Sequence, residues 1–294
     1  MKLLFIVNPI SGGVNKERFL NDAQQLCNRY GITLTIFKTT GKNDAEQLQK
    51  ILEKEQPNKV AAVGGDGTVL FAATCLLDSE LPLGIIPKGS ANGMAKELHV
   101  NVNAIEALKD IIMSEVHRGL DLLRINGTHY SMHIGDVGIN ANLVKSFSAD
   151  SRRGMMTYAK YFIEEIKRTK AFAVKVEVDG NTTKELCYMV AICNSGRYGT
   201  GVILNKQSDL FDGKFEIVLL REKGINTLID AGLTKFNEFF YKGTHTHTLS
   251  GKHARIYFDK PRLLQLDGEI IGTFEELEVE LLKGAVRIIS RNKL

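Results

Sequence analysis

The sequence predicts two joined parts, an α/β domain with a parallel sheet followed by a β-rich domain with an antiparallel sandwich. In the first 120 residues, short apolar runs alternate with segments of helical spacing. This alternation is typical of a parallel sheet that is covered by helices on both faces. From residues 119–121 onward, short strand-like runs dominate, and Asn-Gly or Asp-Gly pairs between them favour tight turns.

The N-terminal elements follow from local patterns. Four apolar runs are predicted strands: residues 2–7, 32–37, 59–63 and 83–86. Apolar side chains at helical spacing predict helices over residues 19–30, which Gly31 ends, and over residues 103–116. Asp44 and Gln47 predict a capping box at the start of another helix.

The C-terminal elements are mainly short strands. The predicted strands are residues 122–125, 129–134, 173–178, 187–193, 215–219, 254–258, 263–266 and 277–282. The turn pairs are Asn126-Gly127, Asp179-Gly180, Asp212-Gly213 and Asp267-Gly268. Helices over about 155–168 and 225–241 interrupt the strands. The pattern predicts an antiparallel sandwich or barrel.

Composition excludes several classes of protein. The 294 residues are 44% hydrophobic and 24% charged, which is ordinary globular usage. The four cysteines form no CxxC pair, so neither a zinc ribbon nor a disulfide framework is expected. No apolar run approaches the ~20 residues that span a bilayer. We therefore expect a soluble cytoplasmic protein.

The charge is only mildly basic. The 38 basic and 34 acidic residues leave a net charge of +4, which argues against a nucleic-acid partner. Basic side chains concentrate in residues 151–170. This window is either a solvated helix face or a surface attracted to phosphate or anionic lipid.

Three glycine-rich turns each follow a predicted strand. They are Asn8-Pro9-Ile10-Ser11-Gly12-Gly13, Gly64-Gly65-Asp66-Gly67-Thr68 and Gly89-Ser90-Ala91-Asn92-Gly93. Loops at the carboxyl ends of parallel strands meet at one edge of the sheet, where ligands bind. Glycine lets backbone N–H groups approach a phosphate, and a following helix adds its positive end. The three turns together predict a phosphate-binding site.

Asp66 lies inside the second of these turns. It either caps the helix that follows or anchors a nucleotide-bound Mg²⁺, a cation that prefers carboxylate and water ligands. The Walker A pattern is absent, and no GxGxxG follows the first strand. A P-loop NTPase and an ordinary dinucleotide dehydrogenase are therefore disfavoured.

These motifs, together with Leu266-Asp267-Gly268-Glu269 near the C-terminus, resemble the diacylglycerol kinase catalytic family. The family includes bacterial lipid kinases and sphingosine kinases, and the resemblance covers essentially the whole chain. It implies a domain similar to NAD kinase and phosphofructokinase over residues 1–120 with about 286–294. It also implies a lipid-substrate domain over residues 121–285, with the active site in the cleft between the two.

The resemblance also implies specific site residues. The ATP-binding positions are Asn8, Ser11, Gly12, Gly13, Thr40, Gly65, Asp66, Gly67, Thr68 and Ser90. Thr39 is an alternative to Thr40. Glu269 is the expected proton acceptor, with Asp66 as a second catalytic residue; for Glu269 alone, a solvated turn residue is the competing interpretation.

A second metal site is implied in the loop before residue 215. Asp212 would contribute its side chain to a structural Mg²⁺, while Asp209 and Lys214 would contribute backbone carbonyls. An Asp-Gly turn without metal is the alternative. Asp121 resembles an acidic position near the active site of the family.

One position departs from the family pattern. Gly93 stands where many diacylglycerol kinases have an aspartate, and the Gly-Ser-x-Asn form is closer to sphingosine kinases. We therefore expect an ATP- and Mg²⁺-dependent lipid kinase that acts on diacylglycerol or a related lipid at the inner membrane surface. A homodimer is one assembly to test. The alternatives are a sphingosine-type kinase, an NAD kinase, and a nucleotide- or lipid-binding regulator without catalysis.

Overall fold

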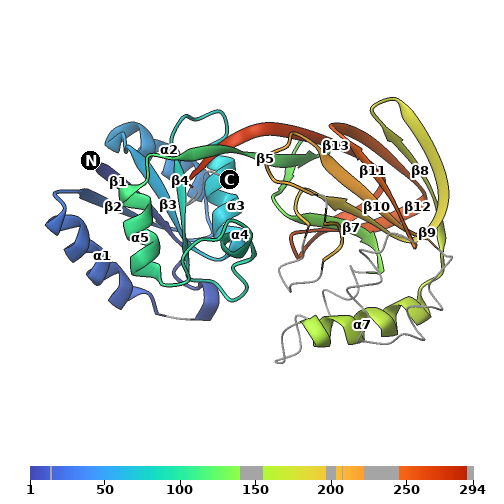
Figure 1. Cartoon of the computed structure of the whole chain (residues 1–294), viewed down its shortest axis with the longest axis horizontal. Helices are drawn as coiled ribbons and strands as arrows, with labels where there is room; N and C mark the ends of the chain where they lie inside the picture. The colour runs from blue at the N-terminus through green and yellow to red at the C-terminus, as the bar shows by residue number, and fades with distance from the viewer. Residues whose placement is uncertain (14, 140–154, 197–202, 207, 222–244, 290–294) are drawn as a thin grey trace. The chain divides into compact units, whose positions relative to one another are not determined.

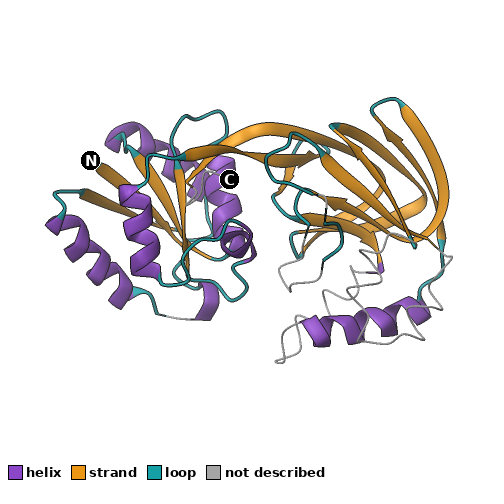
Figure 2. Ribbon diagram, viewed as in Figure 1, coloured by secondary structure: helices purple, strands orange, loops and turns teal. Residues whose placement is uncertain are grey.

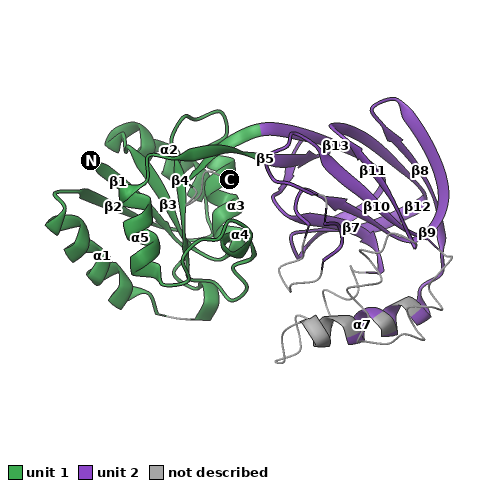
Figure 3. Cartoon of the chain, in the orientation of Figure 1, with its two compact units in different colours: residues 1–120, 284–294 green, residues 121–283 purple. Residues whose placement is uncertain are grey.

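The chain forms two compact units. The structure, a computed structural model, describes residues 1–13, 15–139, 155–196, 203–206, 208–221 and 245–289 (Figure 1). Unit 1 comprises residues 1–120 and 284–294, and unit 2 comprises residues 121–283 (Figure 3). Strands and helices alternate in unit 1, whereas strands dominate the described part of unit 2 (Figure 2). The α/β and β-rich fold classes predicted from the sequence are confirmed.

Unit 1 is built on a parallel sheet in the order β2-β1-β3-β4. These strands are β1 (Lys2–Val7), β2 (Thr33–Lys38), β3 (Lys59–Gly64) and β4 (Leu83–Pro87). All neighbours pair in parallel. The end of β13 (Glu269–Ile289) extends the sheet in parallel beside β4, with Ile288 opposite Leu83. The end of the last strand thus belongs to unit 1.

Helices cover both faces of this sheet (Figure 1). The helices are α1 (Glu17–Arg29), α2 (Asp44–Glu55), α3 (Asp66–Cys75), α4 (Gly93–Glu97) and α5 (Ala104–Met113), with a 3₁₀ turn, η1 (Ser11–Gly13). Successive side chains of a strand point to opposite faces. Leu3, Phe5 and Val7 of β1 therefore pack with buried residues of α1 and α5 in one hydrophobic cluster.

The start of α2 differs from the predicted capping box. The N-cap residue is Asn43, in the left-handed region at φ 53°, and it makes no side-chain capping bond. Asp44 lies inside the helix, and its carboxylate accepts hydrogen bonds from Thr40 and Gly41 instead. Gln47 donates to the carbonyl of Lys42. The capping-box prediction was wrong because the carboxylate binds the preceding loop rather than the helix.

Helix α5 ends against a half-buried lysine of β3. Lys59 Nζ donates to the carbonyls of Ile111, Ile112 and Ser114 at 3.0, 3.2 and 2.6 Å. These carbonyls have no partner within the helix, so a cation at this end is favourable. Desolvation by burial lowers the pKa of Lys59.

Replacing Lys59 by Met is expected to destabilise the protein by about 1–3 kcal/mol, because buried carbonyls lose a charged donor. Urea unfolding followed by circular dichroism measures this change. Lys54→Met is the matched control, since the Lys54 side chain is 81% exposed and its ion pair with Glu55 spans 3.7 Å. Equal stability of the two variants would contradict the expected role of Lys59.

The described strands of unit 2 pair mainly antiparallel. They are β5 (His117–Ile125), β6 (His129–Ser131), β7 (Ile134–Gly138), β8 (Phe172–Val178), β9 (Asn181–Cys193), β10 (Phe215–Arg221), β11 (Thr246–Gly251) and β12 (His253–Leu266), together with most of β13. One helix, α7 (Met155–Arg168), is also described. Strands β5 and β13 contribute to both units.

Strands β7 and β8 both lie between two long strands, β9 and β12. Strand β9 pairs with β8 along its first half and with β7 along its second half. Strand β12 pairs with the same two strands in the same way. Alternate residues of β8, from Phe172 to Val178, belong to one hydrophobic core cluster of unit 2. This explains the alternating pattern seen in the sequence.

Three of the four predicted turn pairs form tight hairpins. Both residues of Asn126-Gly127, Asp179-Gly180 and Asp267-Gly268 have positive φ, as a type I′ turn requires. In Asp212-Gly213 only the glycine does, and the pair belongs to the loop that precedes β10. This pair therefore does not form a two-residue hairpin.

The strand boundaries also differ in places. The predicted strands 254–258 and 263–266 form one strand, β12, whose pairing with β13 shifts register between Tyr257 and Arg262. Strand β11 was not predicted, because its threonines and histidines lack a clear apolar alternation. The predicted helix 225–241 and Arg152 and Arg153 lie outside the described residues. No helix among the described residues is long and apolar enough to cross a membrane.

Candidate functional site

The three glycine-rich loops of unit 1 lie against one another. An ideal Cβ at Gly12 would lie 2.6 Å from the carbonyl oxygen of Lys88. A Cβ at Gly89 would lie 2.3 Å from the Cα of Gly65. Only glycine permits this backbone approach. The structure therefore brings together loops that are far apart in the sequence.

Asp66 joins the second loop to the third. Its carboxylate accepts hydrogen bonds from the N–H groups of Gly93 and Met94, at 2.8 and 2.9 Å, at the start of α4. Asp66 therefore caps α4, not the helix α3 in which it lies. Asn92 holds the same loop through two 2.9 Å bonds with the backbone of Gly89.

The first loop is ordered by Asn8 and Lys16. Asn8 Oδ1 accepts from the N–H groups of Ile10 and Ser11 at 3.1 and 3.2 Å. Lys16 is 4% exposed, and its Nζ donates to the carbonyl of Ser11 at 2.5 Å. Desolvation by burial, and then the nearby charge of Lys88, lower the pKa of Lys16. Two cations near a glycine loop favour an anion there.

A cavity of about 450 Å³ opens beside these loops. It is lined by Asn8, Pro9, Ile10, Thr39, Thr40, Gly41, Asp44, Gly67, Thr68 and Phe71. The Thr68 side chain is buried, and its Oγ1 has no hydrogen-bond partner among the residues that the structure describes. A buried hydroxyl without a partner is costly, so a ligand that supplies one would bind favourably here.

Asp44 orders the wall of this cavity that contains Thr40. Its carboxylate accepts from the N–H and hydroxyl of Thr40, both at 2.9 Å, and from the N–H of Gly41 at 2.7 Å. Slight desolvation raises the pKa of Asp44, but these hydrogen bonds outweigh it and hold the pKa below its usual value. Thr39, the alternative to Thr40, lines the same cavity.

Glu269 lies in unit 2, directly after the Asp267-Gly268 turn. It is exposed at the start of β13. Asp267 fixes the turn, because its carboxylate accepts from Ser131 Oγ at 2.7 Å and from the N–H groups of Met132, His133 and Ile134 at 2.9 to 3.2 Å. The geometry thus presents Glu269 to solvent on a rigid hairpin.

The loop with Asp209, Asp212 and Lys214 is also in unit 2. Asp212 Oδ1 accepts from the N–H of Lys214 at 2.9 Å, and Asp209 Oδ1 accepts from the N–H of Phe211 at 3.1 Å. Asp121, 1% exposed, accepts from the N–H of Gly213 at 2.7 Å and so anchors the loop. The donor set is all oxygen, which fits Mg²⁺. The described residues contain no cluster of three acidic, histidine or cysteine side chains that could hold a metal alone.

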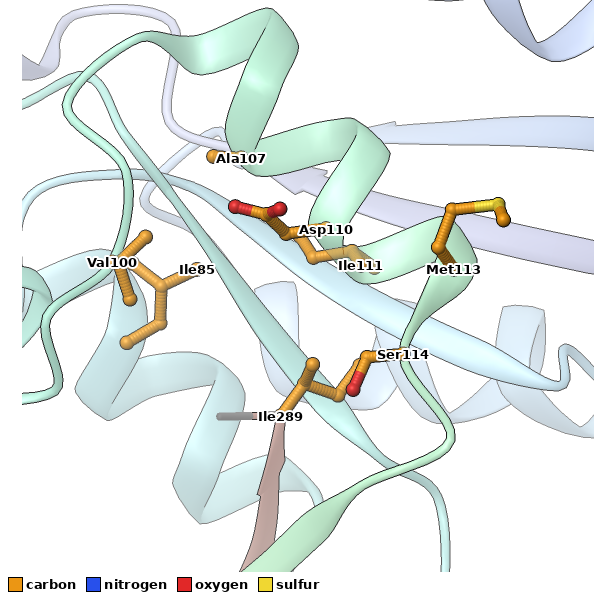
Figure 4. A pocket seen from close by; sticks show the side chains of 8 residues that line it. All are labelled: Ile85, Val100, Ala107, Asp110, Ile111, Met113, Ser114 and Ile289. Atoms are coloured by element: carbon orange, nitrogen blue, oxygen red, sulfur yellow. The ribbon is translucent and has the colours of Figure 1, made fainter. Parts of the chain in front are cut away.

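Not every expected residue lines the 450 Å³ cavity. Asn8, Thr40, Gly67 and Thr68 do, whereas Ser11, Gly12, Gly65, Asp66 and Ser90 belong to the adjoining loops, and Gly13 lines a neighbouring cavity. A further cavity of about 230 Å³, lined by Ile85, Asp110 and Ile289 among others, contains none of the expected residues (Figure 4).

Sequence reasoning assigned no site role to Lys16, Lys88, Asp44 or Phe71. The lysines had a usable signal, since each lies within four residues of a glycine of these loops. Asp44 was noticed, but as a helix cap. Phe71 had no signal, because one aromatic residue in an apolar helix is indistinguishable from core.

Two models of known protein families match this chain. Residues 2–125 match the diacylglycerol kinase catalytic domain, and residues 136–290 match the YegS C-terminal NAD kinase beta sandwich-like domain. The two matches define the class: the chain is a kinase whose catalytic domain precedes a sandwich-like domain. It belongs to the diacylglycerol kinase catalytic-domain family.

Individual relatives are distant in sequence. The diacylglycerol kinase of Bacillus subtilis is 24% identical over 273 residues, which cover 91% of this chain and 89% of that protein. An uncharacterized protein of Synechocystis sp. is 25% identical, over 97% of this chain and 69% of that protein. The solved structure of a diacylglycerol kinase from Bacillus anthracis superposes with a TM-score of 0.73 at 21% identity, covering 99% of this chain and 97% of that one. This likeness shows the fold.

Proposed function

We propose that the protein is an ATP- and Mg²⁺-dependent lipid kinase, which transfers the γ-phosphate to the hydroxyl of diacylglycerol or a related lipid. The observation that carries the proposal is the convergence of three glycine loops beside a cavity with the Thr68 hydroxyl, which has no hydrogen-bond partner in the described part of the chain. Such loops offer backbone N–H groups to phosphates, and the cavity has room for part of a nucleotide.

The chain's own residues would share the chemistry. The loops and the cations Lys16 and Lys88 would hold the phosphates. Glu269 would accept the proton of the lipid hydroxyl as that oxygen attacks the γ-phosphate. Mg²⁺ at Asp66 would supply charge neutralisation when bound. Catalysis would then depend mainly on positioning and electrostatics.

A structural Mg²⁺ in the loop of residues 209–214 is the second part of the proposal. Asp212 would hold it with its carboxylate, together with the carbonyls of Asp209 and Lys214. This loop is anchored by Asp121, as described above.

A membrane surface is the expected location of the lipid. The described part of the basic window contributes exposed Lys167 and Arg168 at the end of α7. Contact with anionic lipid through this helix predicts vesicle binding that weakens as salt rises.

The deciding experiment is transfer of labelled γ-phosphate from Mg-ATP to diacylglycerol, a sphingoid base or NAD, each offered separately. Labelled diacylglycerol supports the proposal. Label in the sphingoid base or in NAD reassigns the acceptor, and ATP binding without any transfer favours a non-catalytic regulator.

Replacing Thr68 by Val tests the nucleotide cavity. The nearly isosteric change removes an unpaired hydroxyl, so the Tm should stay the same or rise. The affinity for Mg-ATP should fall about 2- to 10-fold, the equivalent of one hydrogen bond of about 0.5–1.5 kcal/mol. Calorimetric titration measures the affinity.

Thr74→Val is the control for this variant. Thr74 lies on the same helix, and its hydroxyl donates to the carbonyl of Phe71 at 2.9 Å. It should keep wild-type ATP affinity. Unchanged affinity in Thr68→Val as well would argue against a nucleotide contact at this hydroxyl.

A further inference from the structure

A buried amide holds the hairpin that carries Glu269. Gln265 is 1% exposed and lies at the end of β12. Its Oε1 accepts a hydrogen bond from the N–H of Gly268 at 2.8 Å, inside the turn itself. Its Nε2 donates to Asp136 Oδ2, and Asp136 is fully buried on the neighbouring strand β7.

The two residues face each other by register. Gln265 and Asp136 are direct partners in the antiparallel pairing of β12 with β7. Beside them, the pairing of β12 with β13 shifts, so that Leu264 lies opposite Gly272 whereas Gln265 lies opposite Ile270. Ile271 is therefore an extra residue, two positions after Glu269. Such bulges re-aim neighbouring side chains and recur next to active sites.

The chemistry of the pair fixes the direction of the amide. The hydrogen bond to Asp136 Oδ2 uses the N–H₂ end of the Gln265 amide. The carbonyl end is then left for the N–H of Gly268. In a buried site these bonds are strong, and a mismatched partner is costly. Asp136 thus orients Gln265, and Gln265 orients the turn.

We propose that Asp136 and Gln265 are positioning residues for Glu269, acting through the N–H of Gly268. Asp267 anchors the hairpin to the Ser131 hydroxyl and to the backbone N–H groups of residues 132–134. The Asp136–Gln265 pair sets the turn from which Glu269 projects. The inference rests on the proposed role of Glu269 as proton acceptor. It assigns to Asp136 and Gln265, which do not touch the substrate, the task of positioning Glu269.

Exchanging the two functional groups tests the pair. In Gln265→Glu, two carboxyl groups oppose each other and the N–H₂ donor is lost. In the double variant Gln265→Glu/Asp136→Asn, the amide stands at position 136 and the carboxylate at position 265. The pair then again has one donor and one acceptor, in reversed order, and the same net charge as in the wild type, and the N–H of Gly268 still finds an acceptor.

The single variant should lower kcat about 10-fold or more, the range seen when a group that orients a functional side chain loses its partner. KM and Kd for Mg-ATP should not change, because the nucleotide cavity is built from unit 1. The double variant should return kcat to within about 3-fold of wild type, which is a coupling that separate structural effects would not produce.

Several results would overturn the inference. Wild-type kcat in Gln265→Glu removes the positioning role, and so does a folded double variant that stays as slow as the single one. If the single variant does not fold, the double variant alone decides: an active protein supports the pair, and a slow or unfolded one refutes it.

Glu269→Gln, assayed in parallel, separates this inference from the proposed function. If Glu269→Gln remains active, the base assignment fails. If it is inactive while Gln265→Glu is unaffected, only the positioning inference fails.

Discussion

Glu269→Gln is expected to slow phosphate transfer to the lipid by about 100- to 10,000-fold, the range attributed to a general base. The amide keeps the size of the side chain but accepts no proton. Neither the hairpin nor the glycine loops depend on it, because Asp267 and Gln265 hold the turn. The Tm and the affinity for Mg-ATP should therefore match wild type.

Single-turnover transfer of labelled phosphate is the appropriate measurement, since it reports the chemical step rather than product release. Glu275→Gln is the matched control: Glu275 is exposed on the same strand. It should keep wild-type transfer. A fully active Glu269→Gln protein would contradict the assignment, and a loss of ATP affinity in it would show that the residue does something else.

The fold could be predicted well where the local pattern determines it. Strands β1, β3 and β4 of unit 1 are continuous apolar runs buried on both faces, so the sequence marks them within one or two residues. Asp267-Gly268 forms the expected turn because both residues tolerate positive φ. Where the apolar pattern is weak, as in β11 or in the bent middle of β12, tertiary pairing determines the strand.

Only those parts of the candidate site that belong to a sequence motif could be predicted. The glycines predicted the converging loops, because the backbones of these loops lie in contact and a residue with a Cβ would clash there. Asp44 and Gln265 could not be assigned, since their partners depend on which loop or strand lies beside them. A polar side chain in sequence has many possible partners, and only the folded chain selects one.

Gly89→Ala should disrupt the three glycine-rich loops more than any other single methyl group. Its Cβ would lie 2.3 Å from the Cα and 2.8 Å from the N of Gly65, and 2.9 Å from Asn92 Oδ1. Two of these atoms are backbone, so no rotamer change relieves the clash and the loops must separate. Overpacking of this kind costs about 1–3 kcal/mol. The affinity for Mg-ATP should fall about 10-fold or more, because each 1.4 kcal/mol is a factor of ten.

Gly180→Ala separates this effect from general destabilisation. Gly180 is in a unit 2 turn at φ +87°, with no atom within 4 Å of an added Cβ. Alanine there should cost about 1–2 kcal/mol of backbone strain, yet leave ATP affinity unchanged. Calorimetric titration and thermal unfolding of both variants give the comparison. If Gly89→Ala lowered only the Tm, by as much as Gly180→Ala, the loops would tolerate separation and their contact would have no role in nucleotide binding. If it lowered ATP affinity while the control did not, the glycine contact itself would be what shapes the phosphate site.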